Sequence, residues 1–216
     1  TGRTGSGKST AAQLAMRIFD PSEGEITLND QALKDWQIDA FRRVTGYVPQ
    51  EVFLFSDSIE NNIAFGLDQA DVSQDKIINA AKEAHVAHNI ESFEHGYQTL
   101  LGERGVNLSG GQKQRISIAR AFIRKPRLLV LDDCLSAVDT ETEDFILKSI
   151  RRACKDSAVI MVSHRVSCIR GADRILVLDQ GRMIEYGTPQ DLLGAKGSYA
   201  NMVQQQSWGE APSVNP

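Results

Sequence analysis

The segment Gly2-Arg3-Thr4-Gly5-Ser6-Gly7-Lys8-Ser9 matches the pattern G-x-x-x-x-G-K-[ST] at every fixed position. Apolar residues at helical spacing follow it between positions 11 and 19, so the loop opens a helix, as the pattern requires. The glycines let backbone N–H groups wrap phosphates, while Lys8 offers a charge to the outer phosphates and Ser9 a hydroxyl to Mg²⁺. The segment predicts a nucleotide site formed by Gly2, Arg3, Thr4, Gly5, Ser6, Gly7, Lys8, Ser9 and Thr10.

This pattern ordinarily follows a buried strand, yet only Thr1 precedes it here. A parallel sheet that lacks a central strand exposes unpaired backbone edges. We therefore expect the chain to be a fragment of a longer protein, with at least one central strand upstream.

A second glycine-rich segment, Leu108-Ser109-Gly110-Gly111-Gln112, stands directly before another apolar run at helical spacing, which Pro126 stops. Ser109 is a favourable helix cap, and the two glycines let backbone N–H groups approach an anion closely. A helix N-terminus attracts phosphate through its unpaired donors and its dipole. The sequence thus predicts two anion sites that lie far apart along the chain.

Strand-like and helical patterns interleave along the 216 residues, which favours the α/β class. Continuous apolar runs at 128–131 and 158–162 predict parallel strands buried on both faces. Further strands are expected at 25–28, 44–48, 175–178 and 182–185, the last two forming a hairpin, and a helix after Thr188-Pro189. We expect an ATP-binding core at 1–52 and 126–206, a helical insertion at 53–125 and a disordered tail at 207–216.

Composition limits the partners and the compartment. The net charge of −4 argues against nucleic acid as the main partner. No apolar run approaches the roughly 20 residues of a membrane span, so a membrane role requires a partner or another segment. Three cysteines without metal spacing favour reduced thiols in the cytosol, and Cys134 is expected to be a buried thiol. His85 and His88 have no evident third ligand and are expected to be exposed on a helix at 75–93.

Several polar residues follow strands at their carboxyl ends, where ligands lie in open α/β sheets. Asp132 suits Mg²⁺ and its waters, and Asp133 is placed to orient or deprotonate attacking water. Gln50 and His164 follow two other strands and are expected to reach the same water or metal and the terminal phosphate, respectively. The predicted catalytic residues are Asp133, His164 and Gln50, and the predicted metal ligands are Ser9, Gln50 and Asp132.

Taken together and in order, these segments resemble the nucleotide-binding domain of an ATP-binding cassette (ABC) transporter between Gly2 and about Gln206. In that resemblance, residues 2–10 are Walker A, Gln50 the Q-loop, 108–112 the signature, 128–133 Walker B, 136–139 the D-loop and His164 the switch histidine. The segments Gly102-Glu103-Arg104-Gly105 and Val52-Phe53-Leu54-Phe55 resemble those of exporters of the multidrug and lipid type.

The resemblance implies a P-loop NTPase (RecA-like) core with a mainly parallel sheet and a helical subdomain. It also implies that ATP, with Mg²⁺, is sandwiched between Walker A of one domain and the signature of a second domain. Leu108, Ser109, Gly110, Gly111 and Gln112 would then bind ATP held by the partner chain. Asp139 is either a helix cap or an inter-subunit contact. A transmembrane domain fused upstream would hold the chain at the cytoplasmic face of the inner membrane.

The family usually has Glu where this chain has Asp133, and the shorter side chain withdraws the carboxylate by about one C–C bond. We therefore expect slow hydrolysis at this chain's own site, as in the weakened site of an asymmetric heterodimer. A homodimer in which Asp133 works adequately is the other interpretation. A soluble ABC ATPase and a mainly ATP-binding regulatory module are the alternative functions.

Overall fold

The computed structural model describes residues 1–209, and the expectation of disorder for 210–216 lies outside that range. Its centre is a parallel sheet of three strands in the order β3-β4-β5, with bounds Thr45–Val48, Leu128–Asp132 and Ala158–Val162. The central strand β4 is buried on both faces, and Leu129, Val130 and Leu131 are at most 1% exposed. The predicted α/β fold and both predicted parallel strands are confirmed.

Alternation along β4 divides the core into two layers, because successive side chains of a strand point to opposite faces. Val130 packs with Ala12 and Met16, next to helix α1 (Lys8–Ala15), in the smaller cluster. Leu129 and Leu131 belong to the larger cluster, which includes Ile146 of helix α7 (Thr140–Ala153). The phosphate loop is therefore carried by a helix packed on β4 and β5, close to the carboxyl ends of both strands.

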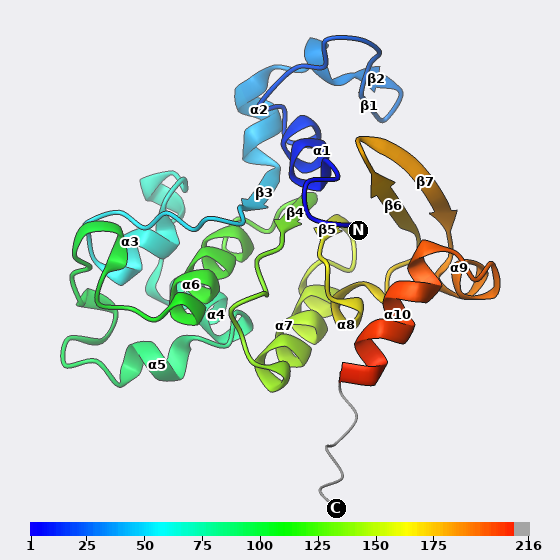
Figure 1. Ribbon diagram of the computed structural model, residues 1–216. Helices are drawn as coiled ribbons and strands as arrows, with labels where there is room; N and C mark the ends of the chain where they lie inside the picture. The colour runs from blue at the N-terminus through cyan, green and yellow to red at the C-terminus, as the bar shows by residue number, and fades with distance from the viewer. Residues whose placement is uncertain (210–216) are drawn as a thin grey trace, which may run out of the picture.

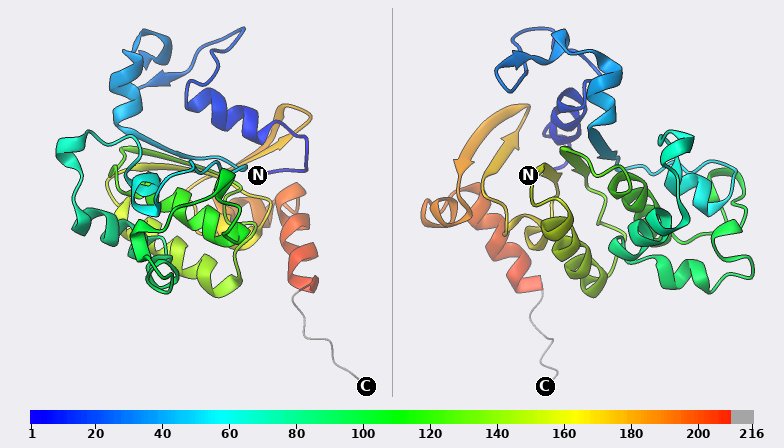
Figure 2. Two further views of the ribbon diagram at one scale, coloured as in Figure 1. Left: turned by 90° about the vertical axis from the view of Figure 1, so that its left-hand side faces the viewer. Right: turned by 180° about the vertical axis from the view of Figure 1, so that it is seen from behind.

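The helical insertion lies on one side of the sheet, away from the β6–β7 hairpin (Figures 1 and 2). Helix α6 (Gly110–Phe122) is its centre and contacts α3 (Ile59–Ala64), α4 (Gln74–Glu83) and β3. The insertion also contains α5 (Ala87–Glu91) and three 3₁₀ turns, η2 (Gln69–Asp71), η3 (Gly96–Gln98) and η4 (Glu103–Gly105).

The single helix expected at 75–93 is wrong, because it divides into α4 and α5. His85 has a φ of 55° between them, and a residue in the left-handed region ends a helix. The His85 ring is half-buried and its centroid lies 4.3 Å from that of Phe145, so only His88 is exposed as expected.

The predicted hairpin is confirmed as β6 (Ile175–Asp179) and β7 (Arg182–Gly187), which pair antiparallel. The start of the chain lies against β6: Gly2 forms a parallel bridge with Leu178, and the Thr1 amine donates to the Leu176 carbonyl at 2.7 Å.

On β5 the side chains of Val159 and Ile160 are more than a third exposed. The described parallel sheet thus ends at β5, whose apolar side chains are partly exposed.

The remaining elements complete the chain. Strands β1 (Thr27–Leu28) and β2 (Gln31–Ala32), the 3₁₀ turn η1 (Leu33–Asp35) and helix α2 (Ile38–Arg43) precede β3. A short helix α8 (Val166–Ile169) follows β5, and α9 (Pro189–Gly194) and α10 (Ser198–Gly209) follow β7. Residues 207–209, expected to be disordered, continue α10 instead, since Tyr199 is buried and anchors that helix. Across the described residues, none of the helices combines the length and apolar composition that a bilayer span needs.

Candidate functional site

The phosphate loop is held in its shape by glycine conformations and by contacts with its surroundings. Gly2, Gly5 and Gly7 all have positive φ, and Gly7 stands immediately before α1 without a side-chain cap. A Cβ on Gly2 would lie 2.1 Å from the Leu178 carbonyl oxygen, so no larger residue fits there. The first N–H groups of α1 therefore stay free of side-chain partners, as an anion site at a helix N-terminus requires.

Lys8 folds back over its own loop, and its Nζ donates to the Arg3 carbonyl at 2.7 Å. Ser6 is buried behind the loop at 2% exposure, and its hydroxyl has no hydrogen-bond partner among the described residues. The Gly181 N–H donates to the Ser6 carbonyl at 3.1 Å, which ties the loop to the hairpin turn. These contacts hold the loop in place from within and from the hairpin turn.

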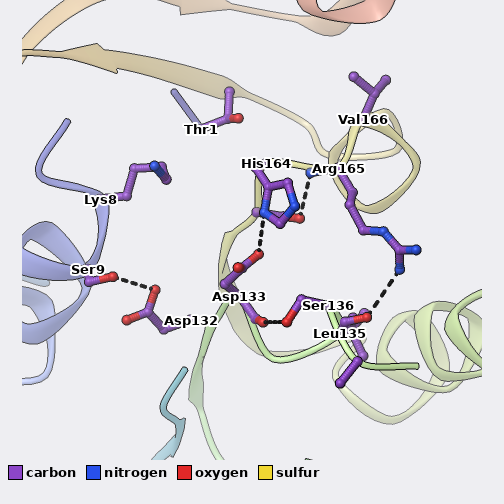
Figure 3. Close-up of polar contacts among 12 residues, drawn as sticks. Thr1, Lys8, Ser9, Asp132, Asp133, Leu135, Ser136, His164, Arg165 and Val166 are labelled. Carbon is purple, nitrogen blue, oxygen red and sulfur yellow. Dashed lines mark hydrogen bonds and ion pairs between the residues drawn. The ribbon is translucent and has the colours of Figure 1, made fainter. Parts of the chain in front are cut away.

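Two predicted metal ligands contact each other directly: the Ser9 hydroxyl donates to Oδ1 of Asp132 at 3.0 Å (Figure 3). Asp132 is 2% exposed, and this burial, together with the charge of Asp133, raises the pKa of its carboxyl, although the Ser9 hydrogen bond acts in the opposite direction. Gln50 lines the same cavity. A hydroxyl, a carboxylate and an amide form the oxygen donor set that Mg²⁺ takes alongside phosphate oxygens and water, so these residues fit the ion.

Asp133 and His164 form the second polar pair of the site (Figure 3). Oδ1 of Asp133 lies 3.0 Å from Nδ1 of His164, and the two side chains are 15% and 58% exposed. Asp133 adopts a φ of 46°, which Asp tolerates better than most residues, and its N–H donates to the Val162 carbonyl at 2.9 Å. The strand pairing therefore brings the ends of β4 and β5 together and directs the carboxylate toward the histidine.

These two pairs and the phosphate loop surround one cavity of about 270 Å³. Ten predicted residues line it together with Val162: Thr4, Gly5, Gly7, Lys8, Ser9, Thr10, Gln50, Asp132, Asp133 and His164. Gly2, Arg3 and Ser6 do not line it, since Gly2 and Ser6 lie behind the loop and Arg3 is exposed. The predicted residues at the strand ends thus meet the phosphate loop in space.

The signature segment, residues 108–112, lies outside this cavity. Ser109 caps α6: its hydroxyl accepts from the Gln112 N–H at 3.3 Å, and the Gln112 side chain accepts from the Ser109 N–H at 2.9 Å. The predicted helix start is confirmed. Leu108 is buried in the core, whereas Ser109 and Gly110 are exposed.

Asp139 caps helix α7, with Oδ1 accepting from the Thr142 N–H at 2.8 Å and Oδ2 from its hydroxyl at 2.9 Å. These bonds hold the pKa of the Asp139 carboxyl below its usual value. The helix-cap interpretation is therefore supported, and an inter-subunit contact stays a prediction. Cys134 is a buried thiol, as expected, and its burial raises its pKa.

Three residues around the site carry no clear signal in the sequence. Arg165, next to the histidine, pairs with buried Glu143 and donates to the Leu135 carbonyl at 3.2 Å (Figure 3). The Gln114 side chain accepts from the Ala137 N–H at 3.2 Å and so joins the signature helix to the loop before Asp139. Gln206, at the far end of the chain, contacts the backbone on both sides of Arg165. Only the position of Arg165 beside His164 could have drawn attention to it.

Comparison with known proteins places this geometry in a wider context. The model of the ABC transporter family matches residues 1–136. The chain is 44% identical over 201 residues to an ATP-dependent lipid A-core flippase of Pasteurella multocida, covering 93% of this chain and 34% of that protein. It is 44% identical to the ABC-type transporter fsqE of Aspergillus fumigatus, covering 95% of this chain and 16% of that protein.

A solved structure of a bacterial Atm1-family ABC exporter with ATP bound is similar to this fold, with a TM-score of 0.91 and 43% identity. The match covers 95% of this chain and 36% of that one. The chain thus spans about a third or less of the length of these relatives.

Proposed function

The chain belongs to the ABC transporter family, and from that premise we propose that it binds and hydrolyses ATP to drive an exporter. The observation that carries this proposal is the meeting of two polar pairs, Ser9–Asp132 and Asp133–His164, in the cavity of the phosphate loop. The exporters among its relatives support the transport role, although the chain corresponds to only part of each of them. The membrane domain, fused upstream, would hold the chain at the cytoplasmic face of the inner membrane.

The phosphate loop binds and orients the nucleotide. Gly7, Lys8 and Ser9 at the start of α1 line the cavity, where their N–H groups would bind phosphate, and Lys8 would exchange the Arg3 carbonyl for phosphate oxygens. Ser9, Asp132 and Gln50 would hold Mg²⁺, which neutralises charge that develops on the transferred phosphoryl group.

The pair at the strand ends acts on the attacking water. Asp133 accepts a hydrogen bond from this water and orients it toward the γ-phosphate, while His164 holds the carboxylate through its Nδ1 atom. With a proton on both ring nitrogens, as an imidazolium, His164 would donate to Asp133 and to the terminal phosphate at the same time. Phosphoryl transfer needs little more from the protein than such positioning and charge stabilisation.

The signature segment serves a second nucleotide-binding domain. Its exposed Ser109 and Gly110 lie outside the cavity of their own chain, which supports a site completed by another chain. Two such chains, identical or different, then pair head to tail around ATP. Ala137 lies next to the glycines of the signature segment, and Asp139, two residues further along, is exposed. Asp139 is therefore proposed to contact the partner.

The turnover of this chain's own site is proposed to be slow, because Asp133 stands where the family usually has Glu. A carboxylate displaced by about 1 Å can lower a rate on the order of a hundredfold. In the extreme case the chain is mainly an ATP-binding regulatory module that leaves hydrolysis to a partner with Glu at this position.

The direct test is ATP-dependent phosphate release by the full-length protein in lipid. Lys8→Ala should remove activity and nucleotide binding, because the loop loses its only lysine. Lys148→Ala is the matched control, since Lys148 is exposed on α7 and pairs with Asp144 away from the cavity. Equal activity of the two variants would overturn the proposed function. Activity that depends on DNA or ribosomes rather than on a membrane domain would favour a soluble ABC ATPase.

A further inference from the structure

The loop that carries His164 is held at its backbone by a single distant side chain. Nε2 of Gln206 donates to the His164 carbonyl at 2.6 Å, and Oε1 of Gln206 accepts from the Val166 N–H at 2.7 Å. The nitrogen and the oxygen of the Gln206 amide thus bind backbone groups on either side of Arg165. The partners are separated by 40 and 42 positions in the sequence, so the contact is entirely tertiary.

Residues nearby in the sequence do not supply hydrogen bonds to the His164 carbonyl and the Val166 N–H. Helix α8 begins at Val166, and its N-cap residue, Arg165, makes no side-chain capping bond. The hydroxyl of Ser163, just before this loop, accepts from the Arg165 N–H at 3.0 Å instead. Gln206 therefore supplies from α10 the cap that the sequence around α8 lacks.

Helix α10 is seated firmly enough to define the position of Gln206. Tyr199, near its start, is 1% exposed, and Val203 packs against the main core. The Glu185 carboxylate of β7 accepts from the N–H groups of Ser198 and Tyr199, which fixes the first turn. Helix α10 also contacts α8 and α9, and Figure 1 shows it running beside both.

We propose that Gln206 is a positioning residue for ATP hydrolysis, which sets the place of His164 by clamping the backbone of its loop from α10. The inference rests on the proposed ATPase function. His164 is more than half exposed, so few packing contacts hold its ring where it meets Asp133. With the clamp in place, the carbonyl of His164 is fixed and its ring is aligned with the carboxylate at 3.0 Å. The C-terminal helix thereby becomes part of the catalytic apparatus without touching the nucleotide.

The test compares Gln206→Met with Gln205→Ala in the full-length protein, measuring kcat and KM for ATP and the thermal unfolding midpoint. Methionine keeps the length and volume of the side chain but makes neither hydrogen bond. We expect kcat to fall about five- to tenfold, the effect of one or two lost neutral hydrogen bonds on an aligned group. The KM for ATP should stay within about twofold, since ground-state binding is unaffected. Gln205 is exposed on the same helix and should change neither constant.

Two further variants separate positioning from stability. Gln206→Glu keeps an acceptor for the Val166 N–H but places a carboxylate oxygen against the His164 carbonyl, which repels it, so its kcat should fall at least as far as that of Gln206→Met. Val166→Pro removes the N–H at a first helical position, where proline fits, and Arg165 has φ −87° and ψ 124°, which suits a residue before proline. The combined Gln206→Met and Val166→Pro loss should be smaller than the product of the single losses, because both break the same bond.

The outcomes are distinct. An inactive wild type would overturn the proposed function itself. An active wild type, with Gln206→Met lowering only the unfolding midpoint and leaving kcat unchanged, would show that the clamp is merely structural and would overturn this inference. A rise in KM with kcat unchanged would overturn it as well.

Discussion

Oδ1 of Asp133 lies 3.0 Å from Nδ1 of His164, across the ends of two hydrogen-bonded parallel strands. Asp132 pairs in register with Val162, so the sheet brings Asp133, one residue after the first strand, close to His164, two residues after the second. The contact shows that an aspartate at this position reaches the histidine. Since Asp133 is shorter than the Glu usual in the family and is held beside the ring, the turnover of the site depends on how far its carboxylate lies from the attacking water.

Replacing Asp133 by Glu should raise kcat at least about tenfold, since the longer side chain advances the carboxylate by about one C–C bond toward the water. Steady-state phosphate release by the full-length protein is the measurement. Asp156→Glu, in an exposed turn before β5, adds the same methylene away from the site and should have no effect. Unchanged turnover of the Asp133→Glu variant would contradict the weakened site and favour a homodimer in which Asp133 works adequately.

Mixing two inactive variants should restore activity if the signature segment of one chain completes the site of another. Lys8→Ala disables the phosphate loop, and Gly110→Asp places a carboxylate where phosphate would approach. A Cβ at Gly110 meets only the Ala137 Cβ at 3.8 Å, so the variant chain should fold normally. Each variant alone should lose at least about a hundredfold in turnover, as loss of a main phosphate contact does.

A mixed dimer retains one site with an intact loop and an intact signature, so co-reconstitution should recover up to half of the activity per mixed dimer. The control mixes Lys8→Ala chains with Lys148→Ala chains, which contain an exposed substitution only. If the two inactive variants recover nothing although they co-purify as a dimer, the site is not shared in this way.

The site was predictable where local pattern determines it. The apolar runs at 128–131 and 158–162 predict buried parallel strands, and such strands end at a common edge, so Asp132 and His164 were expected to meet. The helix start at Ser109 could be predicted for the same reason, because the capping serine and its reciprocal glutamine lie within four residues.

Other features depend on contacts between distant residues. Nothing near Gln206 indicates that its amide bridges the backbone 40 residues earlier. The sequence does not indicate the break between α4 and α5, because His85 is neither Gly nor Pro and adopts the left-handed conformation in its tertiary surroundings beside Phe145. The Arg115 side chain donates to the His85 carbonyl, a contact that no periodicity contains.

Replacing Asp132 by Asn should stabilise the unliganded protein at neutral pH while lowering Mg²⁺-dependent turnover about a hundredfold or more. Burial raises the pKa of this carboxyl in the fold, so the protonated form is favoured there. Its contribution to stability is present at low pH and is lost as pH rises through the folded pKa. Asn resembles the protonated acid, so the gain should be seen at neutral pH and should vanish in acid.

Urea unfolding without nucleotide or Mg²⁺ measures this effect, and Asp139→Asn provides a comparison of opposite sign. Hydrogen bonds from Thr142 lower the pKa of Asp139, so its stabilisation is present at neutral pH and is lost as pH falls through the folded pKa. The two variants should therefore shift the unfolding midpoint in opposite directions at pH 7. A destabilised Asp132→Asn variant would contradict the prediction.

Replacing Arg120 by Lys should lower the free energy of unfolding by about 1–3 kcal/mol, because a lysine cannot reproduce its fork of hydrogen bonds. The guanidinium donates to the Asn62 carbonyl at 2.7 Å, to the Asn62 side chain at 2.9 Å and to the Phe53 carbonyl at 2.9 Å. It also lies 5.6 Å from the ring centres of Phe55 and Phe65, and its burial lowers its pKa to about 10. Arg127→Lys, at an exposed position, should be neutral in the same urea titration. Equal midpoints for the two variants would mean that the charge alone, rather than the fork, joins helix α6 to the segment after Gln50.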